Sequence, residues 1–176
     1  MHIIFFNTKG GVCKSTLCDY SANELMRLGY SVEVTNTDQQ NHVEAINTPD
    51  ADFSLYDTAG VYLGETIKLL ELAREAAENG QPVRVVVPMT LGHNDQIELP
   101  FLLEKLQEIG ILDLCVFVFT KVRKNSKTLR ERKGHLSGLG LNVSKFSLPY
   151  SEDFINRRFT TKTRNEISNF LHEVFL

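Results

Sequence analysis

A chain of 176 residues with 42% hydrophobic and 23% charged side chains has the length and balance of one globular domain, expected over residues 1–176. This balance excludes a disordered or fibrous protein, and the net charge of −3 does not by itself indicate a partner. The three cysteines form no metal-type C-x-x-C pair, and the apolar start is too short for a signal peptide or a membrane span. These features favour a soluble, cytoplasmic protein with reduced thiols.

Short apolar runs alternate along the chain with longer amphipathic segments. Strands are predicted at 2–6, 30–36, 53–57, 82–88, 114–120 and 142–148. Helices are predicted at 14–29, 63–80, 94–110, about 125–137 and about 163–175. The helix at 94–110 could instead begin at Pro100, since proline is tolerated in a first helical turn. Strands that alternate with helices pair in parallel through crossover helices, so the predicted fold is α/β, a mostly parallel twisted sheet with helices on both faces.

The segment NTKGGVCKST, residues 7–16, joins the first predicted strand to the first predicted helix. It approximates the phosphate-binding pattern G-x-x-x-x-G-K-[ST], but Thr8 and Cys13 occupy the positions of the two outer glycines. Between a strand and a helix, such a loop directs its amides and the helix N-terminus at phosphates. Lys14 would reach the β- and γ-phosphates, and the Ser15 hydroxyl would bind Mg²⁺. The alternative is a glycine-rich turn that only caps a helix.

The sequence KGGVCKST resembles the deviant phosphate loop K-G-G-x-G-K-[ST] of the ParA/MinD family of P-loop ATPases, in which Lys9 matches an additional signature lysine. TNTDQQ at 35–40 is similar to the family's D-x-D-P-Q stretch, and FSLYDTAG at 53–60 to its apolar strand that ends in aspartate before a switch loop. The resemblance implies a P-loop NTPase fold, ATP or ADP with Mg²⁺ as cofactors, and a homodimer that forms around ATP. In that family the signature lysine crosses the dimer interface to the partner's nucleotide.

The resemblance also implies which residues form the site. The implied catalytic residues are Lys9, Lys14 and Asp38, and the implied magnesium ligands are Ser15, Asp38 and Asp57. The implied nucleotide contacts are Lys9, Gly10, Gly11, Val12, Cys13, Lys14, Ser15, Thr16, Asp57, Gly60, Lys121 and Pro149. Either aspartate taken singly is better explained as a turn or cap residue, but both are predicted at the carboxyl ends of adjacent strands, beside the loop.

Two departures from the family pattern concern the hydrolytic residues. Asn36 replaces the first aspartate of D-x-D, and Gln39 replaces the proline, whereas Asp38, the position that orients the attacking water in the family, is kept. Because phosphoryl transfer requires mainly positioning and charge neutralisation, hydrolysis remains feasible.

Cys13 is the third departure, because the family has glycine there. If the loop needs a positive φ at this position, the side chain costs roughly 1 kcal/mol or more relative to glycine. That cost corresponds to ATP binding weakened about fivefold to tenfold. A low-pKa redox thiol beside Lys14 and a helix N-terminus is an alternative interpretation, ranked below that of a tolerated small residue.

Two basic segments are candidates for non-specific DNA binding. The segment at 121–133 carries Lys121, Arg123, Lys124, Lys127, Arg130, Arg132 and Lys133 against one acid, and a solvated helix face explains it equally well. The second group, Arg157, Arg158, Lys162 and Arg164, lies where related partition ATPases place DNA-contacting arginines. The first strand begins at residue 2, so the resemblance is to a small plasmid-partition ParA without an N-terminal helix-turn-helix domain.

The composition of the last predicted helix indicates whether it could attach the protein to a membrane surface. MinD-like proteins end in a basic amphipathic helix, but here the apolar stripe of RNEISNFLHEVFL is flanked by Glu166 and Glu173. We therefore expect this helix to pack on the sheet and the protein not to bind a membrane.

The leading hypothesis is a ParA-like ATPase that dimerises around ATP, binds nucleoid DNA, and partitions a plasmid or positions cargo through hydrolysis stimulated by a ParB-like or other partner. Its intrinsic turnover would be slow. The alternatives are a degenerate nucleotide-binding scaffold with little hydrolysis, a MinD-like positioning ATPase, and a related small-molecule ligase or kinase.

Overall fold

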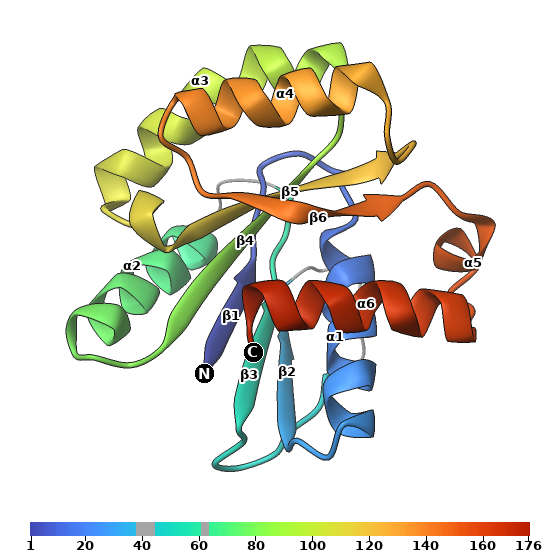
Figure 1. Ribbon diagram of the computed structural model, residues 1–176. Helices are drawn as coiled ribbons and strands as arrows, with labels where there is room; N and C mark the ends of the chain where they lie inside the picture. Colours follow the sequence, from blue (N-terminus) through green and yellow to red (C-terminus); the bar gives the residue numbers. More distant parts are fainter. Residues whose placement is uncertain (38–44, 61–63) are drawn as a thin grey trace.

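In the part of the chain that the structure describes, six parallel strands form the centre of the molecule, in the order β2-β3-β1-β4-β5-β6 (Figure 1). The structure is a computed structural model that describes residues 1–37, 45–60 and 64–176. The strands are β1 (His2–Phe5), β2 (Val32–Asn36), β3 (Phe53–Asp57), β4 (Val83–Met89), β5 (Cys115–Val122) and β6 (Val143–Pro149). Each pairing between these strands is parallel. The predicted parallel α/β architecture is therefore confirmed.

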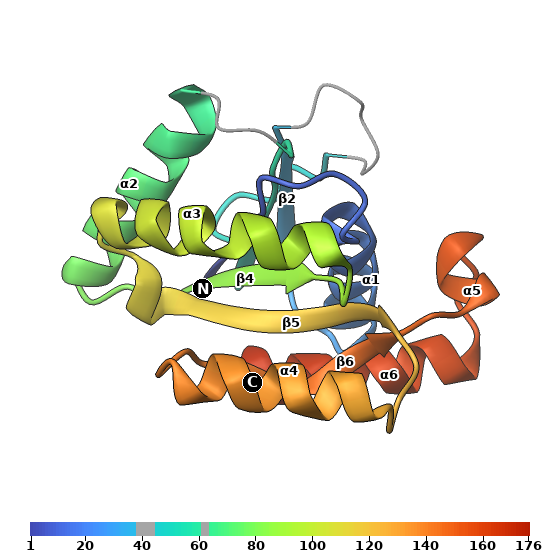
Figure 2. The same cartoon turned by 90° about the horizontal axis from the view of Figure 1, so that it is seen from above.

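Helices cover both faces of this sheet. They are α1 (Lys14–Arg27), α2 (Gly64–Glu78), α3 (His93–Ile109), α4 (Lys127–Gly138), α5 (Glu152–Ile155) and α6 (Thr161–Val174). In Figure 1, α6 crosses beside α1, and Figure 2 shows α2 and α3 on one side of β4 and β5 with α6 on the other. The short α5 and a 3-10 turn, η1 (Leu112–Leu114), are elements that the sequence did not predict.

The apolar residues divide into two cores, one on each face of the sheet. In β1, Ile3 and Phe5 join the core under α1 and α6, whereas Ile4 joins the core under α2, α3 and α4. This alternation follows from the two-residue period of a strand. In α6, the buried apolar residues Ile167, Phe170, Leu171 and Val174 face the first core. The expectation that the last helix packs on the sheet is confirmed.

Pro100 lies inside α3, which begins at His93, so the alternative start at Pro100 is wrong. Proline removes one backbone donor and strains the preceding turn. Here Pro100 is on the exposed side of the helix, while Leu99 and Leu102 are buried beside it. Burial of the apolar face therefore maintains the helix through a residue that usually interrupts one.

The edge strand β6 is protected by two charged side chains. The Glu173 carboxylate of α6 accepts hydrogen bonds from the amides of Lys145 and Phe146, the latter at 2.8 Å. The Lys133 ammonium of α4 donates to the carbonyls of Ser144, Lys145 and Phe146 at 2.8, 2.6 and 3.0 Å. These contacts occupy backbone groups that an edge strand otherwise offers to another chain.

Candidate nucleotide-binding site

The loop at residues 7–16 connects β1 to α1, as the motif requires. Ser15 and Thr16 lie half-buried in the first turn of α1, which begins at Lys14. The loop therefore lies at the carboxyl edge of a parallel sheet, with the positive end of a helix dipole facing the same space. This is the geometry of an anion-binding loop.

Two buried polar side chains that the motif does not include attach this loop to neighbouring strands. Asn7 accepts a hydrogen bond from the Lys9 amide at 2.9 Å and donates to the Pro88 carbonyl at 2.7 Å. The Thr120 hydroxyl donates to the Val12 carbonyl at 3.0 Å. Sequence reasoning missed both residues, and the available signal was a polar residue at the end of an otherwise apolar strand.

Cys13 adopts the left-handed conformation that the sequence analysis considered, with φ 69° and ψ 29°. Gly11 also has a positive φ, of 74°, but glycine adopts it without steric cost. For a residue with a Cβ, this conformation costs about 1–2 kcal/mol. Cys13 is therefore a strained residue immediately before the first helix.

The Cys13 thiol does not have the low pKa that a redox role requires. Burial raises its pKa above the ordinary thiol value, and the nearby Lys121, Thr120 and Thr16 offset only part of that rise. The lowered pKa that the redox interpretation of Cys13 assumed is therefore contradicted, because burial outweighs the positive surroundings.

Lys14 is 7% exposed, and its ammonium donates to the Lys9 carbonyl at 3.1 Å. Gly60, in the loop after β3, lies directly against this region. A Cβ at Gly60 would lie 3.2 Å from the Gly10 nitrogen and 3.4 Å from the Lys14 ammonium. The segment after β3 therefore touches the phosphate loop and its lysine, and only a glycine fits this approach without displacement.

Asp57 ends β3 next to Asn36, its register partner at the end of β2. The Asp57 side chain is fully buried, and its backbone carbonyl accepts hydrogen bonds from the Thr37 amide at 2.9 Å and the Thr37 hydroxyl at 3.1 Å. Burial raises the pKa of Cys18 in α1, and the negative charge of Asp57 raises it further. The Asp57 carboxyl is therefore close to the helix that carries Ser15. The predicted catalytic residue Asp38 lies outside the described residues.

The described part of the chain holds no cluster of three or more histidine, cysteine, aspartate or glutamate side chains that would bind a metal ion. Ser15 and Asp57 offer a hydroxyl and a carboxylate, which are oxygen ligands suited to Mg²⁺. Such an ion commonly completes its shell with water and nucleotide phosphates, so this donor set fits a magnesium–nucleotide complex rather than a free metal site.

Two of the implied nucleotide contacts, Lys121 and Pro149, lie near the ends of the paired strands β5 and β6. Val122 is paired with Pro149, and the Tyr150 amide donates to the Val122 carbonyl at 3.0 Å. Lys121 has a φ of 54° and acts electrostatically on Cys13. Lys121 and Pro149 are therefore on strands that end next to the phosphate loop.

The family model of the CobQ/CobB/MinD/ParA nucleotide-binding domain matches residues 3–163 of this chain. The chain belongs to this family. The resemblance to ParA and MinD that the phosphate loop suggested is thereby confirmed.

Solved structures share the fold of this family member across almost all of its length. A Borrelia burgdorferi protein assigned to plasmid partition, bound to AMPPNP, has a TM-score of 0.64 at 15% identity, covering 97% of this chain and 96% of the other. MinD from Aquifex aeolicus has a TM-score of 0.68 at 11% identity with the same coverage. Cobyrinic acid a,c-diamide synthase from Mycobacterium smegmatis, with ADP and magnesium, has a TM-score of 0.58 at 16% identity, covering 97% of this chain and 92% of the other. A search of the curated proteins found no match.

Lys9, the residue that distinguishes the ParA-like loop, is half-buried at the rim of the site. Its ammonium forms an ion pair with Asp95 of α3, at 2.9 Å. Asp95 lies outside every motif that the sequence offers for this site.

Part of the basic segment at 121–133 has a structural role. Lys124 forms an ion pair with Glu166 of α6 at 2.6 Å, and Lys133 binds the β6 carbonyls. Burial lowers the pKa of Lys133. DNA binding and a solvated helix face were the two explanations offered for this segment; Lys124 and Lys133 instead make contacts within the fold.

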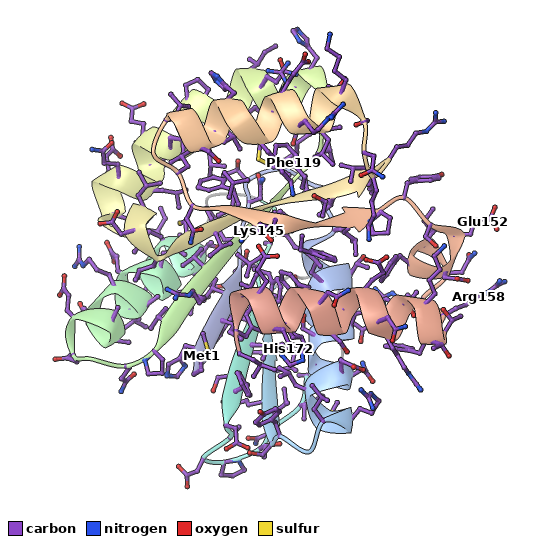
Figure 3. The ribbon with its side chains drawn as sticks, viewed as in Figure 1. Met1, Phe119, Lys145, Glu152, Arg158 and His172 are labelled. Atoms are coloured by element: carbon purple, nitrogen blue, oxygen red, sulfur yellow. The ribbon has the colours of Figure 1, made fainter. Side chains whose placement is uncertain are left out.

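The second basic group is exposed around α5 and the start of α6. Its members are Arg157, Arg158, Lys162 and Arg164. Figure 3 shows Arg158 directed outward from this end of the molecule, near the α5 residue Glu152. Burial raises the pKa of Asp19, and the positive charge of nearby Arg157 offsets part of that rise. The group therefore forms a basic surface with some acidic neighbours.

In the described part of the chain, no helix has the length and apolar character needed to cross a membrane.

Proposed function

We propose that this protein is a ParA-like ATPase that forms an ATP-dependent sandwich dimer, binds DNA non-specifically, and drives DNA partition or cargo positioning through partner-stimulated hydrolysis. The observation that carries the proposal is the phosphate loop with both of its lysines. Lys14 is buried against the loop, Gly60 contacts it from the segment after β3, and Lys9 lies at its rim. A loop that only capped a helix would need neither the buried Lys14 nor the close approach of Gly60.

Each group at this edge of the sheet has a role in that reaction. The loop amides from Gly10 to Thr16 would bind the phosphates, and Lys14 would neutralise the β- and γ-phosphates. Mg²⁺, held by Ser15 and Asp57, would supply further charge neutralisation when bound. Asp38 would orient the attacking water, and Lys9 would complete the site of the partner subunit. A site completed in this way turns over slowly until a dimer and a stimulating partner are present.

The relatives support the choice of nucleotide. A structural neighbour holds AMPPNP, and another holds ADP and magnesium. We therefore assign ATP or ADP with Mg²⁺ to the loop, and the base to the surface beside Lys121 and Pro149.

DNA is assigned to the exposed basic surface formed by Arg157, Arg158, Lys162 and Arg164. A protein that binds DNA through this surface would associate with the nucleoid in the cytoplasm. A ParB-like or other partner protein would stimulate hydrolysis.

Two residues favour a second candidate, a scaffold that binds nucleotide and hydrolyses little. Cys13 introduces strain into the loop, and Asn36 replaces an acid beside Asp57. A small-molecule synthase is also among the structural neighbours, but Lys9 supports the ParA-like assignment because the additional lysine marks that loop.

The decisive experiment measures dimerisation by size-exclusion chromatography with light scattering, with and without ATP and Mg²⁺. The Lys14→Ala variant should lose ATP-dependent dimerisation, whereas Lys68→Ala, which removes an exposed lysine from α2, should retain it. Dimerisation that persists undiminished in Lys14→Ala would refute the mechanism.

DNA binding and hydrolysis are tested separately. DNA binding that requires ATP and weakens steeply as salt rises supports the partition function. Arg158→Ala should weaken it, and Lys68→Ala should not. Phosphate release in the presence of DNA and partner, abolished in Asp38→Ala, separates the ATPase from the scaffold.

A further inference from the structure

Lys9 is held within its own chain by Asp95, a residue 86 positions away in the sequence. The Lys9 ammonium lies 2.9 Å from the Asp95 carboxylate. The Lys9 side chain is 26% exposed, whereas that of Asp95 is 3% exposed. The two halves of this ion pair therefore differ, because the cation can reach solvent and the anion cannot.

Asp95 is fixed by contacts that do not involve Lys9. The Thr90 hydroxyl donates to the same carboxylate oxygen at 2.5 Å, and the Thr90 amide approaches the other oxygen at 3.4 Å. The Gly92 amide in turn donates to the Thr90 hydroxyl at 3.2 Å. A Cβ at Gly92 would lie 3.1 Å from the Asp95 oxygen, so the turn before α3 is closely fitted around this carboxylate.

The backbone of Lys9 is also fixed, independently of its side chain. Its amide donates to Asn7, and its carbonyl accepts from the Lys14 ammonium. Since neither contact uses the Lys9 ammonium, the side chain can change partner while the loop keeps its shape. When Lys9 leaves, Asp95 keeps the Thr90 hydrogen bonds, which reduces the cost of leaving a buried carboxylate without its cation.

We infer that Asp95 is a positioning residue that retains Lys9 in its own protomer, and that Lys9 must exchange Asp95 for the partner's nucleotide when the dimer forms. This inference rests on the proposed function, in which Lys9 acts across the dimer interface. The ion pair then competes with dimerisation, because each protomer must break it before Lys9 can cross. Asp95 thereby sets the ATP concentration and protein concentration at which dimers appear.

Dimerisation of the full chain in ATP and Mg²⁺ provides the first test. Asp95→Asn keeps the size of the side chain and one oxygen that can accept from the Thr90 hydroxyl, but removes the charge that retains Lys9. A charge-assisted hydrogen bond of this kind corresponds to about tenfold in an equilibrium constant, and each dimer breaks two of them, so the dimer dissociation constant should fall by up to about a hundredfold. In a Lys9→Ala background, the same substitution should have no effect.

Glu166→Gln is a matched control, since it removes the carboxylate of the Lys124 ion pair at another surface. It should leave the dimer constant unchanged. If Asp95→Asn weakens dimerisation, or changes it equally with and without Lys9, then Asp95 has a structural role only and the inference is wrong.

A second measurement does not depend on dimerisation. Brief acylation of the monomer without nucleotide, followed by mass spectrometry, reports how available the Lys9 amine is. We expect Lys9 to be modified slowly in the natural sequence and at least about fivefold faster in Asp95→Asn, with Lys68 as the internal reference. Unchanged Lys9 reactivity would overturn the inference. Protection of Lys9 in a protein that never dimerises with ATP would uphold the Asp95 contact and refute the proposed function instead.

Discussion

Replacing Cys13 by glycine should stabilise the protein relative to replacing it by alanine. Cys13 has φ 69° and ψ 29°, immediately before α1. Both substitutions remove the thiol and its contacts with the core that surrounds Leu17, so the comparison between them isolates the backbone. Alanine keeps the Cβ that makes this conformation costly, and glycine removes it.

The magnitude follows from two opposing effects. The left-handed conformation costs a residue with a Cβ about 1–2 kcal/mol. Glycine restores conformational freedom to the unfolded chain, which costs about 0.5–1 kcal/mol on folding. Cys13→Gly should therefore exceed Cys13→Ala in free energy of unfolding by about 0.5–1 kcal/mol. For a chain of this length, that corresponds to a melting temperature higher by about 2 °C.

Thermal unfolding by circular dichroism, without nucleotide, measures this difference. A parallel titration with a fluorescent ATP analogue then asks whether the Cβ also crowds the phosphates. If the Cβ crowds the phosphates, Cys13→Gly should bind the nucleotide more tightly than Cys13→Ala. The gain in binding free energy should then exceed the difference between the two variants in free energy of unfolding. Equal melting temperatures, or a lower one for Cys13→Gly, would refute the claim that this backbone is strained.

Three further outcomes are expected. Gly60→Ala places a Cβ 3.2 Å from the Gly10 nitrogen, and the resulting displacement of the loop should weaken ATP binding about tenfold in the same titration, while the melting temperature changes little. Glu24 is buried and receives two hydrogen bonds from Arg27, which lower its pKa. Its contribution to stability is therefore fully present above the ordinary glutamate pKa of about 4.3 and is lost as pH falls through the lower folded value. Urea unfolding should accordingly show Glu24→Gln as less stable at pH 7, with a difference that shrinks below about pH 4; a constant difference would contradict this. Glu173→Gln should weaken the cover on the edge strand β6, so light scattering should detect faster aggregation on heating.

The fold could be predicted because its signals are local. The run FSLYD at 53–57 is a strand with the predicted bounds, since apolar residues flanked by turn residues suffice to define it. The errors arose where tertiary packing outweighs local preference. Pro100 continues a helix because the neighbouring leucines are buried, and α5 has four residues, too few to give a periodic pattern.

The site could be predicted only in part. The loop motif identifies Lys14 and Ser15 because phosphate binding needs those groups at consecutive positions. It does not identify Asp95, Asn7 or Thr120, whose contacts with the loop join segments that are far apart in the sequence. The distance of 86 residues between Lys9 and Asp95 leaves no periodic signal, so only the folded chain brings this pair together.

The number of basic residues in a segment predicts DNA binding less well than the contacts that those residues make in the fold. The segment at 121–133 has the composition of a DNA-binding surface. However, Lys124 forms an ion pair with Glu166, and Lys133 donates hydrogen bonds to carbonyls of the edge strand β6. The acids Glu166 and Glu173, which argued against a membrane helix, are the partners that position α6 against this part of the sheet. A basic residue therefore supports DNA binding only where its charge is not already used by a contact within the fold. By that criterion, Lys124 and Lys133 do not support the proposed DNA binding.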